Sequence, residues 1–353
     1  MSNHHPPQRL CEESFSAERY VQRVKLEQAI GHWLQDPRAD GKPILSLVGP
    51  PGSGKSWLLA HIHQTWEANN TFNLFLAARQ LMDPTQHEQI KGEIIRKANV
   101  ACSNLNFPHH LLNPLTALVA DIAQRLCVHC IGQRFLVLVD GCDDLASQEE
   151  FDELQRNYLR PFFNAGVRCF RMIVARRLLL TDHTLRTLST SLTVGTFESD
   201  AETNSHRNKL SSQPRGNGPA WPQLPTCCAY RWNHPYINCY LVHSSQGADI
   251  TMEGLASCCR SLIERSRMGH TAVYQPSIGE ELRKLASITQ KHADGWTSWD
   301  FKDKIGEDLD DTYLLRGLVT ARKADDDMSG PTYRVIDGLR ELLAALPEKE
   351  LRS

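Results

Sequence analysis

Over residues 16–198, short apolar runs alternate with stretches in which apolar residues recur at helical spacing. The apolar runs predict strands, and the periodic stretches predict helices. The predicted strands are 43–48, 71–78, 135–139, 169–175 and 191–197, and the predicted helices are 17–34, 57–63, 87–97, 111–130 and 149–163. The run 135–139 is apolar at every position, which suits a strand buried on both faces. This alternation predicts an α/β domain built on a doubly wound parallel sheet.

The pattern changes after residue 198. Residues 199–226 are rich in Ser, Asn, Pro and Gly and show no periodicity, which indicates a flexible linker or insertion. Helical patterns then resume at 236–242, 252–263, 277–292, 298–305, 311–318 and 337–346, with short strands at 319–322 and 332–336. Three helices and a two-stranded wing, with a polar turn between the strands, predict a winged helix in the C-terminal part.

A glycine-rich turn separates the first strand from the helix that follows it. Residues 49–56 have the spacing G-x-x-x-x-G-K-S of a phosphate-binding loop, the Walker A motif. Glycine lets the backbone N–H groups converge on phosphate, the lysine adds a positive charge, and the serine hydroxyl can bind Mg²⁺. The predicted nucleotide-binding residues here are Gly49, Pro50, Pro51, Gly52, Ser53, Gly54, Lys55, Ser56 and Trp57.

This motif defines the predicted domain organisation. We expect a flexible tail at 1–15, a P-loop NTPase domain at 16–198 and a linker or insertion at 199–230. A small helical segment at 231–270 and a winged-helix domain at 271–353 would follow.

A second phosphate-site motif follows the apolar strand 135–139. Asp140 stands at its end, where an NTPase places the carboxylate that holds Mg²⁺, so Ser56 and Asp140 are the predicted metal ligands. Asp143 could orient the attacking water or cap the helix after it. Arg176 and Arg177 end the next strand, where a guanidinium could contact the γ-phosphate or simply be solvated. The predicted catalytic residues are therefore Lys55, Asp140, Asp143 and Arg177.

Together these segments resemble the STAND class of signal-transduction ATPases, which contains NACHT and NB-ARC domains. Residues 140–144, Asp-Gly-Cys-Asp-Asp, are similar to the D-G-x-D-E form of that class, and 174–177 matches its T-S-R segment in the final arginine. Residues 20–27 are similar to F-V-G-R-E-x-E-L, which implies that Val21 and Arg23 contact the nucleotide.

Two C-terminal segments extend the resemblance. Residues 233–241 look like a G-x-P-L-A-L helix start, which implies that Pro235 packs near the base. Residues 333–340 are similar to the M-H-D segment of the winged helix, but Ile336 replaces the histidine that would touch the β-phosphate.

Composition and charge narrow the choice of partners. The net charge is −2, so no global basic field would recruit nucleic acid or anionic membrane, and no apolar run approaches the roughly 20 residues that span a bilayer. Residues 271–353 hold twelve Lys/Arg against sixteen Asp/Glu, which disfavours DNA binding. The N-terminus lacks the features of a signal peptide, and eleven cysteines are an odd number, so we expect a cytoplasmic protein without a disulfide framework. Cys127 and Cys130 have no second ligand pair at zinc-finger distance.

The leading functional hypothesis is an ATP-binding switch in which ATP or ADP, with Mg²⁺, sets the orientation of the winged helix. Slow hydrolysis, separate protein effectors or sensors, and nucleotide-dependent self-association belong to this hypothesis. One alternative is an AAA+-type remodelling ATPase that acts as an oligomeric ring, and another is an ATP-regulated DNA-binding protein. The chain has no N-K-x-D guanine motif, which favours ATP over GTP.

Overall fold

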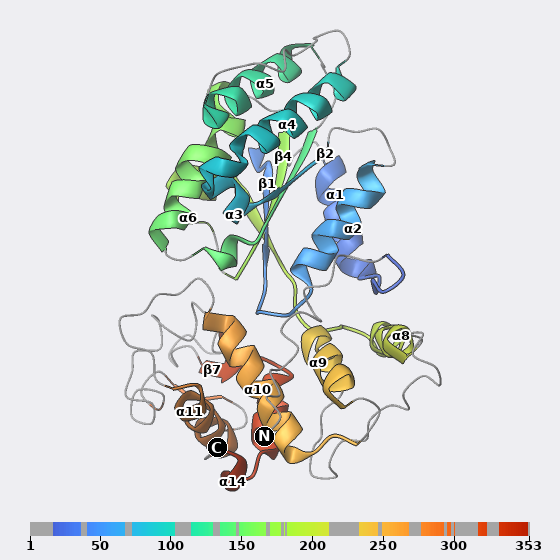
Figure 1. The fold of residues 1–353 in the computed structure, drawn as a ribbon, viewed down its shortest axis with the longest axis vertical. Coiled ribbons are helices and arrows are strands. Elements are labelled where there is room, and N and C mark those ends of the chain that lie inside the picture. Colours follow the sequence, from blue (N-terminus) through green and yellow to red (C-terminus); the bar gives the residue numbers. More distant parts are fainter. Residues whose placement is uncertain are drawn as a thin grey trace.

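The computed structural model places the chain in two units, one above the other in Figure 1. It describes residues 17–36, 41–67, 73–102, 114–129, 135–145, 148–166, 170–177, 180, 182–211, 233–245, 249–267, 277–292, 295–297, 300, 317–322 and 332–351. The upper unit holds a five-stranded sheet, and the lower unit holds helices and a two-stranded sheet. The loops at the carboxyl ends of the long strands face the lower unit.

The large sheet is parallel throughout. Its strands are β1 (Ile44–Val48), β2 (Asn73–Ala77), β3 (Phe135–Asp140), β4 (Phe170–Arg176) and β5 (Ser189–Thr193), in the spatial order β2-β3-β4-β1-β5. The five predicted strands and the parallel α/β sheet are thus confirmed, within a few residues at the ends. Strand β4 lies between β1 and β3, so the loops after these three strands meet at one edge.

Helices cover both faces of this sheet. The helices α1 (Val24–Gln35) and α2 (Lys55–Glu67) pack on one face, and α3 (Ala78–Met82), α4 (His87–Ala101), α5 (Leu115–His129) and α6 (Gln148–Leu154) pack on the other. Because side chains alternate along a strand, Leu136 and Leu138 join the first core, whereas Val137 and Val139 join the second. The strand 135–139 is buried on both sides, as its unbroken apolar run predicts.

The predicted helix 149–163 is less regular than its sequence suggests. After α6 the chain makes one π turn over Gln155–Leu159 and then 3-10 turns over Arg160–Gly166. The amide oxygen of Gln155 accepts a hydrogen bond from the backbone N–H of Asp182, 3.0 Å away, which ties this segment to a distant loop. Pro161 lies where 3-10 turns replace the α-helix, and proline has no backbone N–H to donate within an α-helix.

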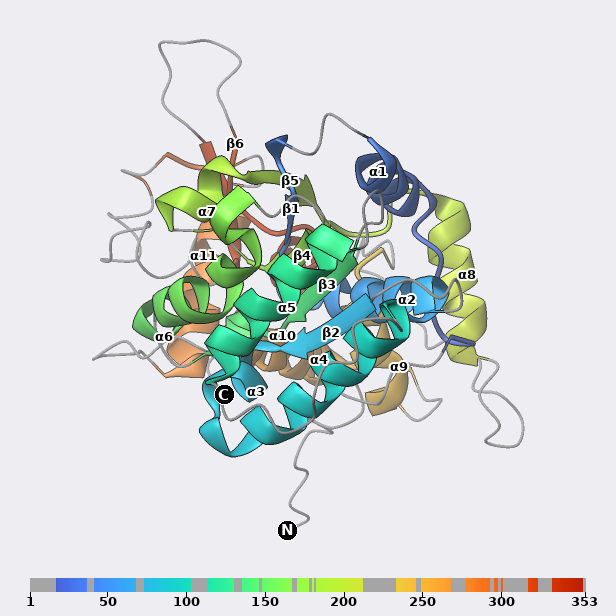
Figure 2. The same cartoon turned by 90° about the horizontal axis from the view of Figure 1, so that it is seen from above.

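A helix occupies the start of the predicted linker. The lack of periodicity predicts an irregular segment over 199–226, whereas Asp200–Ser211 form helix α8, after the short helix α7 (His183–Thr187). Ser199 begins α8, since its hydroxyl accepts from the backbone N–H of Glu202 at 3.2 Å. Salt bridges to Arg23 and Lys25 hold α8 and the turn before it beside the start of α1 (Figure 2). Residues 212–230 of the predicted linker lie outside the described residues.

The lower unit has its own hydrophobic core. It contains α9 (Pro235–Ser245), α10 (Met252–Arg267), α11 (Ile278–Lys291), α13 (Leu339–Ala345) and α14 (Glu348–Leu351), with β6 (Val319–Arg322) antiparallel to β7 (Thr332–Val335). Trp296 adds a third extended segment, because it exchanges two backbone hydrogen bonds of 2.8 Å with Tyr333. The predicted helices 298–305 and 311–318 fall almost wholly outside the described residues, so the winged helix stays a prediction. Among the described residues, no helix is long and apolar enough to cross a membrane.

Candidate nucleotide-binding site

The loop between β1 and α2 adopts a conformation that only glycine accommodates easily. Gly52 and Gly54 have φ angles of 74° and 91°, in the left-handed region. The ammonium of Lys55 lies over the loop and donates to the carbonyl oxygens of Gly49 at 2.7 Å and Pro50 at 3.1 Å. Burial lowers the pKa of Lys55, while Asp143 opposes that shift. The loop is therefore a compact cradle with a positive charge held over it.

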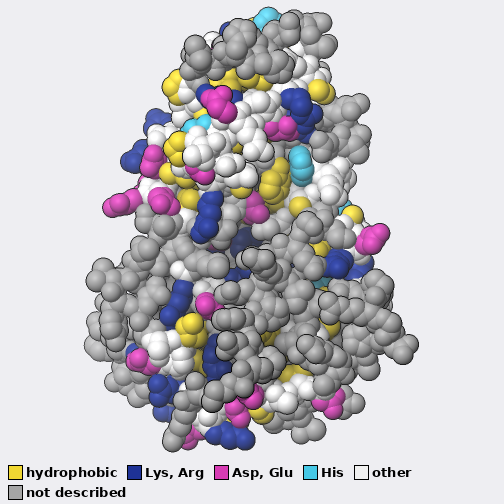
Figure 3. All heavy atoms as spheres, viewed as in Figure 1, with side chains coloured by type: hydrophobic (Ala, Val, Ile, Leu, Met, Phe, Trp, Pro, Cys, Tyr) yellow, Lys and Arg dark blue, Asp and Glu magenta, His cyan; other side chains and the backbone are white. Residues whose placement is uncertain are grey.

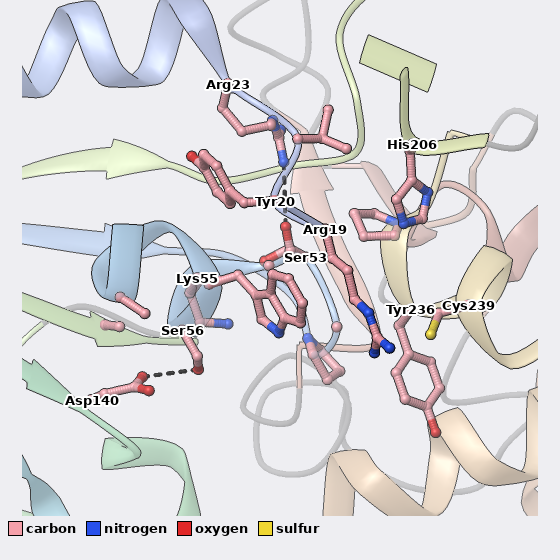
Figure 4. A pocket seen from close by; sticks show the side chains of 18 of the residues that line it. Arg19, Tyr20, Arg23, Ser53, Lys55, Ser56, Asp140, His206, Tyr236 and Cys239 are labelled. Carbon is pink, nitrogen blue, oxygen red and sulfur yellow. Dashed lines mark hydrogen bonds between the residues drawn. The ribbon is translucent and has the colours of Figure 1, made fainter. Parts of the chain in front are cut away.

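Ser56 and Asp140 meet where a P-loop NTPase binds its metal. The hydroxyl of Ser56 donates to Oδ1 of Asp140 at 3.0 Å, from the first turn of α2 to the end of β3 (Figure 4). The described residues contain no group of three or more His, Cys, Asp or Glu that could hold a metal alone. One carboxylate and one hydroxyl suit Mg²⁺, which keeps several waters and takes further ligands from substrate phosphates. The donor set therefore fits a nucleotide-dependent Mg²⁺ site.

Asp143 connects two cations at this edge of the sheet. Its Oδ1 accepts the backbone N–H of Arg177 at 2.8 Å, and its Oδ2 lies 3.7 Å from both Lys55 Nζ and Arg177 Nε. It follows β3 in a 3-10 turn over Cys142–Asp144, and α6 begins only at Gln148. The structure thus directs this carboxylate toward the phosphate loop.

Arg176 and Arg177 are neighbours with different environments. Arg177 donates to the carbonyl oxygen of Ser266 at 2.6 Å and to that of Arg265 at 3.2 Å, at the C-terminal end of α10. Arg176 instead lies over the ring of Phe151, with Cζ 3.5 Å from the ring centroid. Arg176 shares its strand face with Val174, which belongs to the core on the side of α4 and α5, and Arg176 does not line the cavity described below. Arg177 therefore reaches the predicted site, and Arg176 does not.

The segment before α1 folds over the phosphate loop. The guanidinium of Arg23 is buried and donates to the carbonyl oxygens of Ser53 at 3.4 Å and Thr196 at 2.8 Å. Tyr20 stacks on His61, with ring centroids 4.2 Å apart, and its hydroxyl donates to Glu27 at 2.7 Å. Burial raises the pKa of Tyr20 and lowers that of Arg23. These contacts fix the segment that carries Val21 beside the cavity.

The lower unit contacts the phosphate loop at two points. A Cβ added to Gly52 would lie 2.4 Å from the Cβ of Tyr236, in the first turn of α9. A Cβ added to Gly317, just before β6, would lie 3.2 Å from Cδ of Pro51. The loop is thus held between α9 and the turn that enters β6.

A cavity of about 620 Å³ lies at this junction, and both units line it. Of the predicted residues it contains Val21, Arg23, Pro51, Gly52, Ser53, Gly54, Lys55, Ser56, Trp57, Asp140, Asp143, Arg177 and Pro235, but not Gly49, Pro50 or Arg176. Gly49 and Pro50 act instead through the carbonyl oxygens that receive Lys55. Five Lys/Arg side chains and two carboxylates line the cavity, which gives a surplus of three positive charges in a chain whose net charge is −2. This balance fits a polyphosphate ligand.

Several lining residues have no signal in the sequence. Arg19, Phe75, His206, Tyr236, Cys239 and Arg265 also line the cavity. Figure 4 shows Arg19, Tyr236 and Cys239 gathered at the side opposite Asp140. His206 comes from α8, in the stretch without periodicity, and Arg265 comes from the end of an ordinary amphipathic helix. Burial lowers the pKa of His206 to about 4 and that of the buried His234 beside it to about 3. Only the folded chain shows which of these residues meet.

Residues 44–211 match the family model of the NACHT domain. This part of the chain is a NACHT-type P-loop NTPase domain. The match begins at β1 and ends with α8, so the helix that occupies the predicted linker belongs to the NACHT domain. NACHT domains are nucleotide-binding NTPases, which typically use Mg²⁺.

Three solved structures are distantly similar to this chain. The chain is similar to Cdc6p from Pyrobaculum aerophilum at 14% identity and a TM-score of 0.34, over 99% of this chain and 97% of that one. It is similar to the Aeropyrum pernix ORC2 protein, in ADPNP-ADP complexes, at 13% identity and a TM-score of 0.39, over 98% of this chain and 99% of that one. A third match is Drosophila ORC bound to DNA, at 13% identity and a TM-score of 0.37, over 91% of this chain and 93% of that one. A search of curated protein sequences found no significant match.

Proposed function

We propose that this chain is an ATP-binding switch of STAND type. In this proposal ATP or ADP occupies the cavity between the two units, and Mg²⁺ is held by Ser56 and Asp140. The nucleotide then controls the orientation of the lower unit, which includes residues 271–353, the part that we infer to be a winged helix. The observation that carries the proposal is that both units line one cavity.

The physical basis is differential contact. A ligand shifts a conformational equilibrium only by the difference in its affinity for the two states. Here a polyphosphate would touch the NACHT domain through Lys55 and the lower unit through side chains such as Tyr236. ATP and ADP differ in charge and length, so they would favour different arrangements of the two units.

Slow hydrolysis fits the same site. Lys55, Asp140, Asp143 and Arg177 supply the charges that phosphoryl transfer needs. However, Arg177 is engaged with the end of α10 in this arrangement. We infer that hydrolysis is slow while the units are docked in this way.

We infer that the switch acts through separate protein partners and through nucleotide-dependent self-association in the cytoplasm. The acidic balance of residues 271–353 argues against a phosphate backbone as partner. On the face seen in Figure 3, the described basic and acidic side chains are interspersed, without a single-sign patch over the described residues. A protein surface is the partner that suits this charge pattern.

The test compares the wild-type chain with Lys55→Ala. Binding of a fluorescent ATP analogue and the radius of gyration by X-ray scattering would be measured with ADP, with ATP and Mg²⁺, and without nucleotide. We expect the wild type to bind both nucleotides and to change its radius between them, and Lys55→Ala to lose both responses. Equal radii in all states of a nucleotide-bound wild type would refute the switch. A rise to ring-sized assemblies with ATP, seen by light scattering, would favour an AAA+-type machine instead.

A further inference from the structure

Glu27, in the first turn of α1, is the centre of a small hydrogen-bond network. Its Oε1 accepts from the hydroxyl of Tyr20 at 2.7 Å and from the backbone N–H of Arg23 at 2.9 Å. Its Oε2 accepts from the side-chain amide of Gln22 at 3.2 Å and lies 3.6 Å from Nε2 of His61 on α2. One carboxylate therefore joins the segment before α1 to the helix that follows the phosphate loop.

Charge and partial burial strengthen this network. The side chain of Glu27 is 17% exposed, and the ring of Tyr20 is buried and stacked on that of His61. Burial, and then the bond to Glu27, raise the pKa of Tyr20, so its hydroxyl keeps its proton and remains a donor. Hydrogen bonds to a carboxylate are about twice as strong as those between neutral groups. Glu27 is thus a firm anchor for residues 20–22.

The position of Glu27 distinguishes this chain from the pattern that its segment resembles. Residues 20–27 are similar to F-V-G-R-E-x-E-L, in which the last position is leucine, and Glu27 stands there. Val24 and Leu26 replace the two glutamates of that pattern. The carboxylate that anchors the segment therefore comes from a position at which the pattern has an apolar residue.

The anchored segment borders an apolar part of the nucleotide cavity. The carbonyl oxygen of Tyr20 accepts from Lys209 near the end of α8, and Cζ of Arg23 lies 5.1 Å from the centroid of the Phe197 ring. The backbone N–H of Phe197 donates to the carbonyl oxygen of Asn233 at 2.8 Å, just before α9. An apolar wall suits a nucleobase better than a phosphate. The apolar and aromatic residues of this part that line the cavity are Tyr20, Val21, Phe197, Leu210 and Pro235.

Arg23 separates this wall from the phosphate loop. Its guanidinium donates to the carbonyl oxygens of Ser53 at 3.4 Å, Gly195 at 3.2 Å and Thr196 at 2.8 Å. None of these bonds involves Glu27, so the phosphate loop keeps them when Glu27 is changed. Figure 4 shows Tyr20 and Arg23 above the loop and Asp140 below it. A change at Glu27 should therefore affect the nucleoside end of the cavity and spare the phosphate end.

We propose that Glu27 is a positioning residue that holds residues 20–22 against the base of the bound nucleotide. The inference rests on the proposed function, and it adds the residue on which affinity for the nucleoside part of ATP and ADP depends. When the anchor is weakened, residues 20–22 leave their closed position in part of the molecules. The apparent affinity then falls in proportion to the closed fraction.

The experiment measures the affinities of ATP, ADP and inorganic tripolyphosphate, each with Mg²⁺, by displacement of a fluorescent ATP analogue from the full chain. The variants are Glu27→Gln, Tyr20→Phe and the double variant. The control is Glu253→Gln, which changes an exposed glutamate in the first turn of α10. We expect Glu27→Gln to weaken ATP and ADP binding alike, about tenfold, and tripolyphosphate binding less than about twofold. The control should match the wild type.

The double variant tests whether Glu27 acts through Tyr20. Tyr20→Phe removes only the hydroxyl and keeps the ring that stacks on His61. The loss of ATP affinity in the double variant should therefore be smaller than the product of the two single losses. Losses that multiply would show two independent effects and would overturn the proposed role.

The outcomes separate this proposal from the proposed function. Unchanged ATP and ADP affinities in Glu27→Gln, or an equal loss for tripolyphosphate, would overturn the positioning role and leave the nucleotide site intact. If tripolyphosphate binds the wild type too weakly to measure, the double variant decides. If Glu27→Gln unfolds in thermal denaturation, Tyr20→Phe decides, and an unchanged ATP affinity in that variant overturns the role. A wild type that binds neither nucleotide, or a Lys55→Ala variant that binds both as well as the wild type, would refute the nucleotide site itself.

Discussion

The contact between Gly52 and α9 provides a sharp test of how the two units meet. Gly52 and Gly54 both have left-handed backbone angles, and they stand two residues apart in the same loop. A Cβ on Gly54 would meet no atom within 4 Å, whereas a Cβ on Gly52 would lie 2.4 Å from the Cβ of Tyr236. Gly54→Ala therefore strains the backbone alone, and Gly52→Ala strains the backbone and displaces α9.

The size of each effect follows from this geometry. A left-handed conformation costs an L-residue about 1–2 kcal/mol, so both variants should lose about that much unfolding free energy. In Gly52→Ala, two carbons at 2.4 Å must also separate to an ordinary contact of roughly 3.5 Å. Helix α9 must then retreat by roughly 1 Å, which loosens the packing of Tyr236 on the loop.

Urea unfolding and amide hydrogen exchange, both on nucleotide-free protein, would measure the two effects. We expect both variants to lose unfolding free energy, with the larger loss in Gly52→Ala, and faster exchange in α9 (Pro235–Ser245) for Gly52→Ala only. The nucleotide-free state matters because a Cβ on Gly54 would also approach a bound phosphate. Equal exchange in α9 for both variants would refute the docking of α9 on the phosphate loop.

Two further predictions concern the metal and His206. Asp140→Asn should lose the gain in ATP affinity that Mg²⁺ provides, because the carboxylate is the predicted metal ligand, and it should keep metal-free ATP binding. ATP titrations with Mg²⁺ and with EDTA would measure both affinities. An unchanged gain in ATP affinity would exclude Asp140 as a metal ligand. His206 has its pKa lowered from 6.5 to about 4, so below pH 6.5 the unfolded chain takes a proton that the folded chain refuses. Stability should therefore fall between pH 6.5 and 4, by up to about 1.4 kcal/mol per pH unit for this residue. The unfolding free energy, measured with urea at several pH values, should change less steeply with pH in His206→Gln than in the wild type. The exposed control His183→Gln should match the wild type. An equal pH dependence in all three proteins would contradict the lowered pKa of His206.

Local patterns in the sequence were enough to predict the sheet and the phosphate loop. The run 135–139 and the spacing of 49–56 depend on neighbouring residues only, and both predictions agree with the structure. The role of Arg176 stays a prediction; alternation along a strand places its side chain on the face opposite to that of Ala175, over the ring of Phe151. Helix α8 was missed because its caps and salt bridges, rather than an apolar stripe, stabilise it.

Residues that reach the site from far along the chain could not be predicted. Arg265 enters the cavity only because α10 ends against Arg177, a contact between positions 88 residues apart. His206 reaches it because α8 packs beside α9 and Phe197, with ring centroids of Phe197 and His206 4.9 Å apart. The spacing of residues along the sequence does not predict such tertiary contacts.

The lower unit contacts the phosphate loop through Tyr236 and Gly317, and this pair of contacts affects how the two units can separate. Tyr236 and Gly317 are far apart in sequence, yet α9 and the strand after Gly317 belong to one hydrophobic core. A packed core resists internal deformation, so the two contacts move as parts of one body. We therefore expect the chain to pass between its arrangements in a single concerted step, without a stable half-open form.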